Sequence, residues 1–248
     1  MPLQWQAFRL GKGGNAEVDY EDASAGDPAR GRFAVADGAS EASFAGVWAQ
    51  LLVDHFVADA GKPWRGLDWL EPARQQWATA VDSLPLPWYA EEKRELGAFA
   101  TFLGLATRAR ADGSGGIWRA LAVGDACLFH IGAGEVERAF PMTQAADFGN
   151  QPRLLRSRRP GSPTAEVGHQ KAHGRWQPQD RFLLMTDALA QWFLHQLEQG
   201  GDPLAEINDL LQESSPGVAF PHWVETRRRQ SLLRNDDVTL IVVDIDLR

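Results

Sequence analysis

Residues 33–46 read Phe33-Ala-Val-Ala-Asp-Gly-Ala-Ser-Glu-Ala-Ser-Phe-Ala-Gly46, a short apolar run that stops at an aspartate and a glycine. The run predicts a buried strand, and a helical spacing of apolar residues follows it, at Phe44, Val47 or Trp48, Leu51 or Leu52, His55 and Phe56. The Asp37 side chain and the Gly38 carbonyl then lie at a sheet edge, where the missing Cβ of glycine permits close approach. Mg²⁺ and Mn²⁺ prefer such oxygen ligands. An ordinary strand-to-helix turn, for which Asp-Gly is common, is the alternative.

The composition is that of a soluble globular protein, with 23% charged and 44% hydrophobic residues among 248. A net charge of −8 argues against nucleic acid or an anionic membrane as the main partner. Cys127 is the single cysteine, which excludes an intrachain disulfide and favours a reducing compartment. The N-terminal residues lack a signal-peptide pattern, and no apolar run approaches the ~20 residues of a membrane span. We therefore expect a cytoplasmic protein.

The rest of the chain alternates between strand and helix patterns. Strands are expected at 3–9, 97–107, 117–123, 126–131, 136–140, 180–186 and 235–247, and the four that begin at residue 97 resemble an antiparallel meander. Further helices are expected at 66–82, 188–199 and 203–212. Residues 141–175 are irregular, and the basic segment 156–163 predicts an exposed, mobile loop. Arg227, Arg228 and Arg229 are expected on a solvated helix face. Nothing marks a domain boundary, so we expect one domain over 1–248.

Three acidic positions stand at the ends of apolar strands. Asp37 follows one strand, Asp187 follows another, and the pair Asp236-Asp237 opens the last. A carboxylate beside an apolar strand costs desolvation energy unless a cation or a donor compensates it. A shared metal centre explains all three positions, because clustered carboxylates hold two divalent ions about 3.5–4 Å apart and lower the pKa of a water.

Five motifs occur in one order along the chain: Tyr20-Glu-Asp-Ala, Val35-Ala-Asp-Gly, Val123-Gly-Asp, Met185-Thr-Asp and Asn235-Asp-Asp-Val-Thr. This order resembles the PP2C-type (PPM family) metal-dependent Ser/Thr protein phosphatases, and it extends over nearly the whole sequence. The resemblance implies an α+β fold, a four-layer αββα sandwich of two antiparallel β-sheets flanked by helix pairs. It also implies hydrolysis of phosphoserine and phosphothreonine in proteins, by a water that bridges two divalent cations.

The resemblance also implies the metal ligands, which are Asp22, Asp37, Gly38, Asp125, Asp187 and Asp236. Asp37 would bridge both ions with the Gly38 carbonyl beside it, and Asp187 and Asp236 would hold the first ion. Asp22 would hold the water shell of the second ion, with Glu21 as the neighbouring candidate. Asp125 would bind a third ion, as in bacterial members. The implied cofactor is Mn²⁺ or Mg²⁺, and the catalytic residues are Asp37, Asp187 and Asp236.

The sequence departs from the family pattern at several positions. Ala39-Ser40-Glu41 follows Asp-Gly, Ala188 follows the second Asp, and Asp237 stands where Asn is usual. The arginine that clamps the substrate phosphate is replaced by Glu17. Arg9 or Lys12 are candidates to bind phosphate instead, although bidentate binding favours arginine.

Two functions follow from this pattern. The first is a working phosphatase whose partners are a phosphorylated protein and a cognate Ser/Thr kinase, and which we expect to be a monomer. The second is a pseudophosphatase that binds phosphoproteins without turnover. Covalent catalysis has no candidate nucleophile, because Cys127 is expected to be buried packing. His55 is a weak candidate for a general acid, since it lies on the apolar face of its helix.

Overall fold

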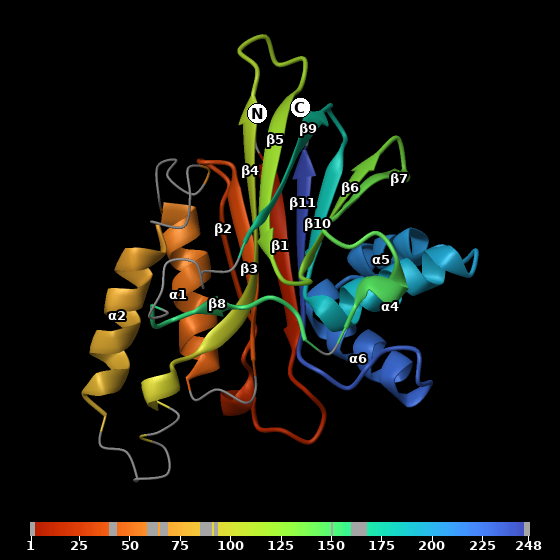
Figure 1. Cartoon of the computed structure of the whole chain (residues 1–248). Helices are drawn as coiled ribbons and strands as arrows, with labels where there is room; N and C mark the ends of the chain where they lie inside the picture. The colour runs from red at the N-terminus through yellow and green to blue at the C-terminus, as the bar shows by residue number, and fades with distance from the viewer. Residues whose placement is uncertain are drawn as a thin grey trace.

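The computed structural model describes residues 3–39, 44–58, 64, 69–84, 91, 94–149, 151–159 and 168–245. Two antiparallel sheets pack face to face, and helices cover the outer face of each (Figure 1). This arrangement confirms the predicted α+β fold class and its αββα layers. Residues 40–43, which include Ser40 and Glu41 of the motif after Asp37, lie outside the described residues.

The first sheet contains both ends of the described chain. Its strands, in spatial order, are β1 (Leu3–Leu10), β11 (Val238–Ile245), β10 (Arg181–Met185), β6 (Cys127–Gly132) and β7 (Glu135–Phe140). Its outer face is covered by α4 (Asp187–Glu198), α5 (Pro203–Gln212) and α6 (Pro216–Arg229) (Figure 1). Phe8 of β1 stacks on Phe220 of α6 with ring centroids 5.5 Å apart. The alternation of residues 3–9 therefore turns Phe8 toward the helices, and Leu3 and Trp5 toward the second sheet.

The second sheet begins at a tight hairpin that precedes Asp37. Its strands, in spatial order, are β2 (Ala23–Asp27), β3 (Arg32–Gly38), β4 (Phe99–Ala109), β5 (Gly116–Val123) and β9 (Gln170–Trp176), and the short β8 (Leu155–Arg156) pairs with β4. Its outer face is covered by α1 (Ala45–Ala58) and α2 (Leu70–Asp82). Two short 3₁₀ helices, η1 (Glu17–Asp19) and η3 (Ala145–Asp147), lie in connecting segments. Residues 66–68 of the predicted helix 66–82 lie outside the described residues.

β3, the strand at the start of residues 33–46, is buried on both faces. Phe33 and Val35 point into the core between the sheets, and Ala34 and Ala36 point toward α1. This two-residue period places large side chains between the sheets and small ones under the helix. The strand therefore reads as a continuous apolar run, because neither face meets water.

The predicted single meander is wrong. β4 pairs with β5 in the second sheet, whereas β6 pairs with β7 in the first, so the chain crosses between the sheets at residues 124–126. Gly124 makes the crossing with φ +95°, and a Cβ there would lie 2.7 Å from Thr101. β4, β5 and β6 are all largely apolar, so their pattern does not say which sheet each one joins. The crossing places Asp125 between the two sheets.

The predicted exposed loop holds for the exposure of Arg156 and Arg159 but is wrong for Ser157, which is buried. Arg158 donates to Asp82 at 2.5 Å and Arg159 donates to Glu71 at 2.8 Å, so both arginines bind α2. Residues 160–163 of this segment lie outside the described residues. Residues 170–176 form the edge strand β9, which sequence reading missed because most of its side chains are polar. For Arg158 and Arg159, the local composition did not indicate that their acidic partners lie on α2.

The arginine run at the end of α6 is not wholly solvated, so that prediction is wrong for two of its three residues. Arg227 ion-pairs with Glu206 and lies 3.7 Å from the centre of the Trp223 ring, and the side chain of Arg228 is only 6% exposed. Among the described helices, none has both the length and the apolar character needed to cross a membrane.

Candidate metal centre

The register of the second sheet brings two of the predicted ligands together. Ala23 of β2 pairs with Ala36 of β3, so continuation of the register sets Asp22 opposite Asp37. Asp37 itself pairs with Thr101 of β4, and the Gly38 amide donates to the Glu21 carbonyl at 3.2 Å. The segment before β2 is thereby held along the end of β3.

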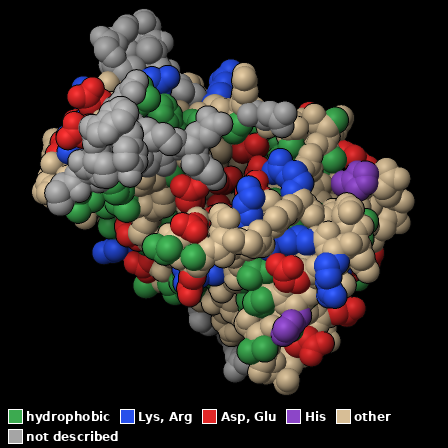
Figure 2. Space-filling model, turned by 90° about the horizontal axis from the view of Figure 1, so that it is seen from below, with side chains coloured by type: hydrophobic (Ala, Val, Ile, Leu, Met, Phe, Trp, Pro, Cys, Tyr) green, Lys and Arg blue, Asp and Glu red, His purple; other side chains and the backbone are tan. Residues whose placement is uncertain are grey.

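The register of the first sheet brings in the remaining predicted ligands. Met185 of β10 pairs with Cys127 of β6 on one side and with Leu240 of β11 on the other. The residues just beyond these pairs are Asp187, Asp125 and Asp236, which therefore gather at the same end of the sheet. Seen from that end, acidic side chains gather in a hollow, with Lys and Arg side chains beside it (Figure 2).

The electrostatics of Asp37 indicate how tightly the carboxylates are gathered. Burial raises the pKa of Asp37 well above its usual range, and the negative charges of Asp22, Asp187, Asp125 and Asp236 raise it further. The other four aspartates predicted as metal ligands thus all act on this one buried group. Like charges at this density favour protonation or a bound cation.

Asp22 is held by hydroxyl groups that come from the first sheet. Its Oδ2 accepts hydrogen bonds from Thr186 Oγ1 at 2.9 Å and from Thr239 Oγ1 at 2.8 Å. Tyr20 extends the network, since its hydroxyl lies 2.5 Å from Thr239 Oγ1. The other oxygen, Asp22 Oδ1, is buried and has no hydrogen-bond partner. Burial raises the pKa of Asp22, although the two threonine hydroxyls act in the opposite direction.

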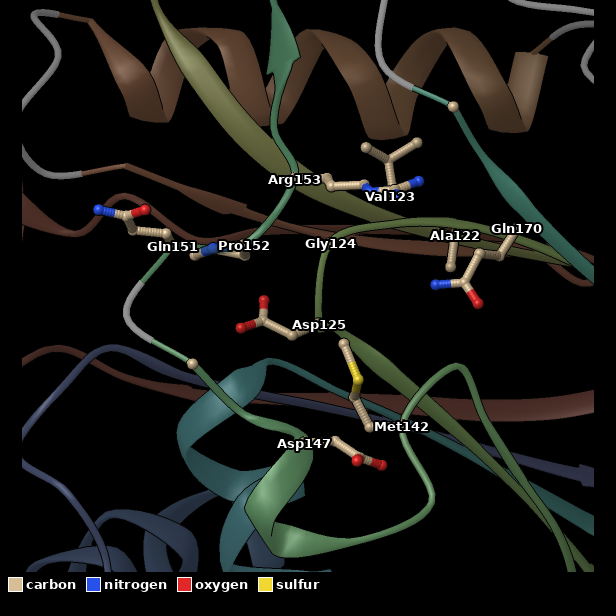
Figure 3. A pocket seen from close by; sticks show the side chains of 12 residues that line it. Ala122, Val123, Gly124, Asp125, Met142, Asp147, Gln151, Pro152, Arg153 and Gln170 are labelled. Atoms are coloured by element: carbon tan, nitrogen blue, oxygen red, sulfur yellow. The ribbon is translucent and has the colours of Figure 1, made fainter.

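Asp125 presents a second unpaired oxygen. The residue is 2% exposed, and its Oδ1 has no hydrogen-bond partner. Burial, and then the charge of Asp187, raises the pKa of Asp125 to about 7. The carboxylate borders a pocket of about 210 Å³ that is also lined by Gln151 and Arg153 (Figure 3).

Asp187 is already bound by a cation from this chain. It is the first residue of α4, and its Oδ2 accepts a hydrogen bond from Arg234 Nη2. The same guanidinium lies 4.0 Å from Asp236 Oδ2. Burial raises the pKa of Asp187, and the charge of Arg234 opposes that shift.

The donor chemistry of this cluster fits a hard divalent cation. The two unpaired buried atoms, Asp22 Oδ1 and Asp125 Oδ1, are carboxylate oxygens. Gly38 fits the close packing of the site, because a Cβ there would lie 2.8 Å from the Glu21 carbonyl oxygen. The described residues include no group of three or more His, Cys, Asp or Glu side chains arranged as a complete metal-binding set. The cluster therefore fits a metal ion by its type of donor atom and by its two unpaired oxygens. Asp187, in contrast, is paired with Arg234.

Asp237 has a different task from its neighbour Asp236. Its Oδ1 accepts from the Lys12 amide and its Oδ2 accepts from the Glu21 amide, both at 2.7 Å. Both oxygens thus bind backbone donors of the segment between β1 and β2. Asp237 fastens this segment to the start of β11, which accounts for an acid where the resemblance leads one to expect Asn.

The two residues predicted to bind phosphate line one pocket beside η1. Arg9 ion-pairs with Glu17 at 3.3 Å, and its guanidinium lies 5.3 Å from the centre of the Tyr20 ring. Lys12 and Arg9 line a pocket of about 410 Å³ together with glycines 11, 13 and 14. Glu17, which stands at the position of the family's clamp arginine, therefore pairs with the arginine proposed to replace it.

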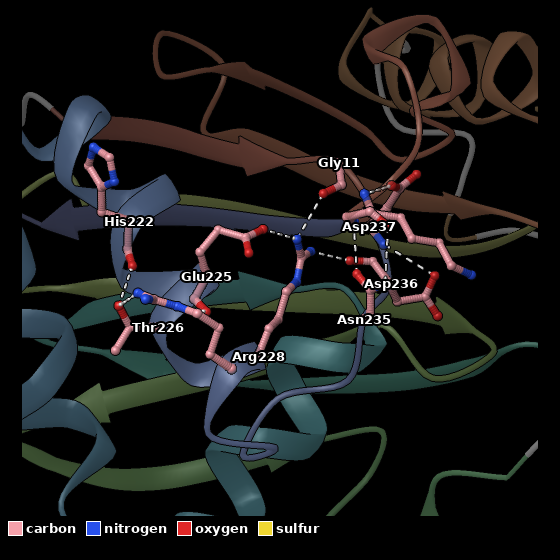
Figure 4. Close-up of polar contacts among 11 residues, drawn as sticks. Gly11, His222, Glu225, Thr226, Arg228, Asn235, Asp236 and Asp237 are labelled. Carbon is pink, nitrogen blue, oxygen red and sulfur yellow. Dashed lines mark hydrogen bonds and ion pairs between the residues drawn. The ribbon is translucent and has the colours of Figure 1, made fainter.

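Two arginines near the carboxylates were missed by sequence reading. Arg228 donates to the carbonyls of Gly11 at 2.9 Å and Asp236 at 2.5 Å, and it ion-pairs with Glu225 at 2.8 Å (Figure 4). It ties α6 to both loops of the site, and nothing in its arginine run distinguishes it. Arg234 immediately precedes the motif that begins at Asn235, so its place beside that motif was an available signal.

The remaining candidate residues have structural surroundings. His55 Nε2 lies 3.0 Å from Gln76 Oε1 of α2, on the helix-packing side of α1. Cys127 is fully buried, as expected, and its thiol donates to the Asp125 carbonyl at 3.2 Å. Burial raises the pKa of Cys127, which disfavours the nucleophilic thiolate.

The architecture, with an acidic hollow at one end of the paired sheets, is that of the PP2C-type phosphatase fold. The serine/threonine phosphatase PstP/Ppp of Mycobacterium tuberculosis is similar over 100% of both chains, with a TM-score of 0.65 and 18% identity. The catalytic domain of PstP in complex with two manganese ions gives a TM-score of 0.61 over 99% of both chains, also at 18% identity.

PppA, described as a key regulatory component of T6SS in Pseudomonas aeruginosa, is similar over 98% of this chain and 97% of its own. Its TM-score is 0.55 and its sequence identity 21%. No protein-family model matches the sequence, and no curated protein matches it by sequence. The likeness therefore lies in the fold, over nearly the full length of each chain.

Proposed function

We propose that this protein is a metal-dependent phosphatase that hydrolyses phosphoserine and phosphothreonine in other proteins. The observation that carries the proposal is the pair of buried, unpaired carboxylate oxygens, Asp22 Oδ1 and Asp125 Oδ1, in a cluster of five aspartates. Such oxygens are costly to bury without a partner, and a hard divalent cation is the partner that suits them. The PP2C-type fold and the manganese-bound PstP structure support the same proposal.

The residues that would hold the cations are Asp22, Asp37, the Gly38 carbonyl, Asp125, Asp187 and Asp236. Two divalent cations, Mn²⁺ or Mg²⁺, would supply a water of lowered pKa and positive charge beside the phosphoryl oxygens, and Asp125 would serve a third. The threonine hydroxyls of residues 186 and 239 hold Asp22 Oδ2, which leaves the buried Oδ1 unpaired and available to a cation.

The chain's own groups favour direct attack by water over a covalent route. The Cys127 thiol is buried and bonded to a backbone carbonyl, and His55 is engaged with Gln76. Neither residue is therefore available as a nucleophile or as an acid for the leaving oxygen. Water oriented by the carboxylate cluster would attack phosphorus in line, and the proton on the leaving seryl oxygen would come from solvent.

A second function is favoured by the ion pairs around the cluster. Arg234 binds Asp187, and Arg9 binds Glu17 at the position of the clamp arginine. If the Arg234–Asp187 and Arg9–Glu17 pairs persist when metal is added, the protein would bind phosphoproteins but would not hydrolyse them. The phosphorylated partner would then be a ligand instead of a substrate.

One experiment separates the two functions. The purified protein is treated with chelator, and hydrolysis of an aryl phosphate and of a phosphothreonine peptide is followed with and without added Mn²⁺. Hydrolysis that vanishes with chelator and returns with Mn²⁺ is the expected result. Absence of hydrolysis of both substrates at every concentration of added Mn²⁺ would favour the pseudophosphatase, and hydrolysis that persists in chelator would refute the metal-dependent phosphatase.

A further inference from the structure

Arg234 holds a position that no motif assigned to it. It lies in the loop between α6 and β11, and its guanidinium contacts Asp187 Oδ2 and lies 4.0 Å from Asp236 Oδ2. Asp187 and Asp236 are the two residues proposed to hold the first metal ion. Its side chain is 41% exposed, so the guanidinium reaches into the acidic cluster while part of it remains open to solvent.

Two other arginines near the hollow are engaged elsewhere. Arg228 has a side chain only 6% exposed and is fixed on the carbonyls of Gly11 and Asp236. Arg9 pairs with Glu17 and lies over Tyr20. Arg234, in contrast, contacts two proposed metal ligands, and its side chain is exposed enough to meet an incoming anion.

The contact with Asp187 has a consequence for metal binding. A divalent ion held by Asp187 would compete with the guanidinium for this carboxylate. With two charges and a preference for oxygen ligands, the ion would outcompete a single charge-assisted hydrogen bond. The guanidinium released by this competition remains on the rim of the site, because its backbone lies two residues from Asp236.

We propose that Arg234 acts as an exchangeable counter-ion, pairing with Asp187 in the metal-free protein and binding the substrate phosphate once metal occupies the site. The proposal rests on the proposed function. The planar guanidinium matches two phosphoryl oxygens, and a phosphate monoester brings the negative charge that Arg234 loses when it leaves Asp187. Arg234 thereby takes the role of the clamp arginine, whose usual position near the start of the chain is occupied by Glu17.

The test measures two equilibria in the chelator-treated protein by titration calorimetry. The first is Mn²⁺ binding, and the second is the binding of inorganic phosphate to the manganese-loaded protein. Arg234→Ala is expected to bind Mn²⁺ more tightly and phosphate about tenfold to a hundredfold more weakly. Arg234→Lys retains the charge without the planar fork, so its Mn²⁺ affinity stays near that of the unsubstituted protein while phosphate binding weakens.

The control is Arg30→Ala, because Arg30 is an exposed arginine paired with Asp27 at 3.2 Å, at the opposite end of β3 from Asp37. It should change neither affinity, and thermal unfolding checks that every variant is folded. Unchanged Mn²⁺ and phosphate affinities in Arg234→Ala would overturn the inference while leaving the proposed function intact. Tighter Mn²⁺ binding with unchanged phosphate binding would overturn the role as phosphate ligand. Failure of the unsubstituted protein to bind Mn²⁺ would overturn both the inference and the proposed function.

Discussion

Thr239 Oγ1 donates a 2.8 Å hydrogen bond to Asp22 Oδ2, and this bond joins the first sheet to the segment that opens the second. Thr186 donates to the same oxygen, and its own Oγ1 accepts from the Thr239 amide at 2.9 Å. Thr239 of β11 and Thr186, the residue between β10 and α4, thus both bind one oxygen of a buried acid. The other oxygen remains free for a cation.

Replacement of these hydroxyls should weaken metal binding without a large change of shape. Thr239→Val and Thr186→Val each remove a donor to Asp22, and we expect Mn²⁺ affinity to fall about tenfold in each variant. Calorimetric titration of the chelator-treated protein measures the effect. Thr226→Val is the matched control, because its hydroxyl bonds the His222 carbonyl within α6. Equal affinities in all three variants would contradict the assigned role of the threonines.

Asp37→Asn should separate stability from function. The substitution removes the charge that four other aspartates repel, so the melting temperature of the metal-free protein should rise. Manganese-dependent hydrolysis should fall by at least ~100-fold, since loss of a ligand exceeds loss of its outer partners. Thermal unfolding and aryl phosphate turnover are measured on the same preparations, with exposed Asp54→Asn as the control. Full turnover in Asp37→Asn at saturating Mn²⁺ would show that the site is assigned wrongly.

The metal-free protein should become less stable as the pH rises from about 4 to about 7. The pKa of Asp125 is raised from 3.8 to about 7, so the folded state binds a proton that the unfolded state has released. The contribution of Asp125 to stability is therefore greatest at a pH below its pKa in the unfolded state. It declines as the pH rises to the pKa in the folded state. Melting temperatures in chelator between pH 4 and 8 should reveal this slope. Asp125→Asn should flatten it in part, and an unchanged slope would exclude Asp125 as a contributor.

Alkylation of Cys127 should have little effect on the native protein. The thiol is fully buried and its pKa is raised, so a thiol reagent should label it only after unfolding. Mass spectrometry before and after denaturant measures the labelling, and turnover is followed in parallel. Rapid labelling of the native protein accompanied by loss of activity would point to a thiol mechanism instead.

The stereochemistry of hydrolysis should reveal a single displacement. No described side chain at the cluster is positioned as a covalent nucleophile, so attack by water should invert the configuration at phosphorus. A chiral thiophosphate hydrolysed in ¹⁸O-water gives the answer. Retention would require two displacements and a phospho-enzyme, and direct attack by water would then be withdrawn.

Most of the secondary structure could be predicted from local pattern. The apolar run before Asp37, the helical spacing after it and the strand 180–186 correspond to β3, α1 and β10. These elements bury continuous or periodic apolar faces, and the spacing of apolar residues in the sequence reveals such faces. Edge strand β9 was missed for the same reason, because its exposed face carries polar side chains.

The candidate carboxylates could also be found from the sequence, because each stands at the end of an apolar strand. Their partners could not. Arg234 on Asp187 and the threonines on Asp22 depend on contacts across 47, 164 and 217 residues, which no local pattern encodes. Arg228 looked solvated within its arginine run, yet it is buried on the carbonyls of two distant loops.

The sequence by itself determined which residues form strands and helices and which acids end them, since burial periodicity and turn chemistry act over a few neighbours. Only the tertiary structure decided that β4–β5 and β6–β7 belong to different sheets, and that Asp125 therefore lies between them. It also decided which acids are paired and which keep a free oxygen. Hydrogen bonds and charges act through space, so their partners are set by sheet register and by the packing of one sheet on the other.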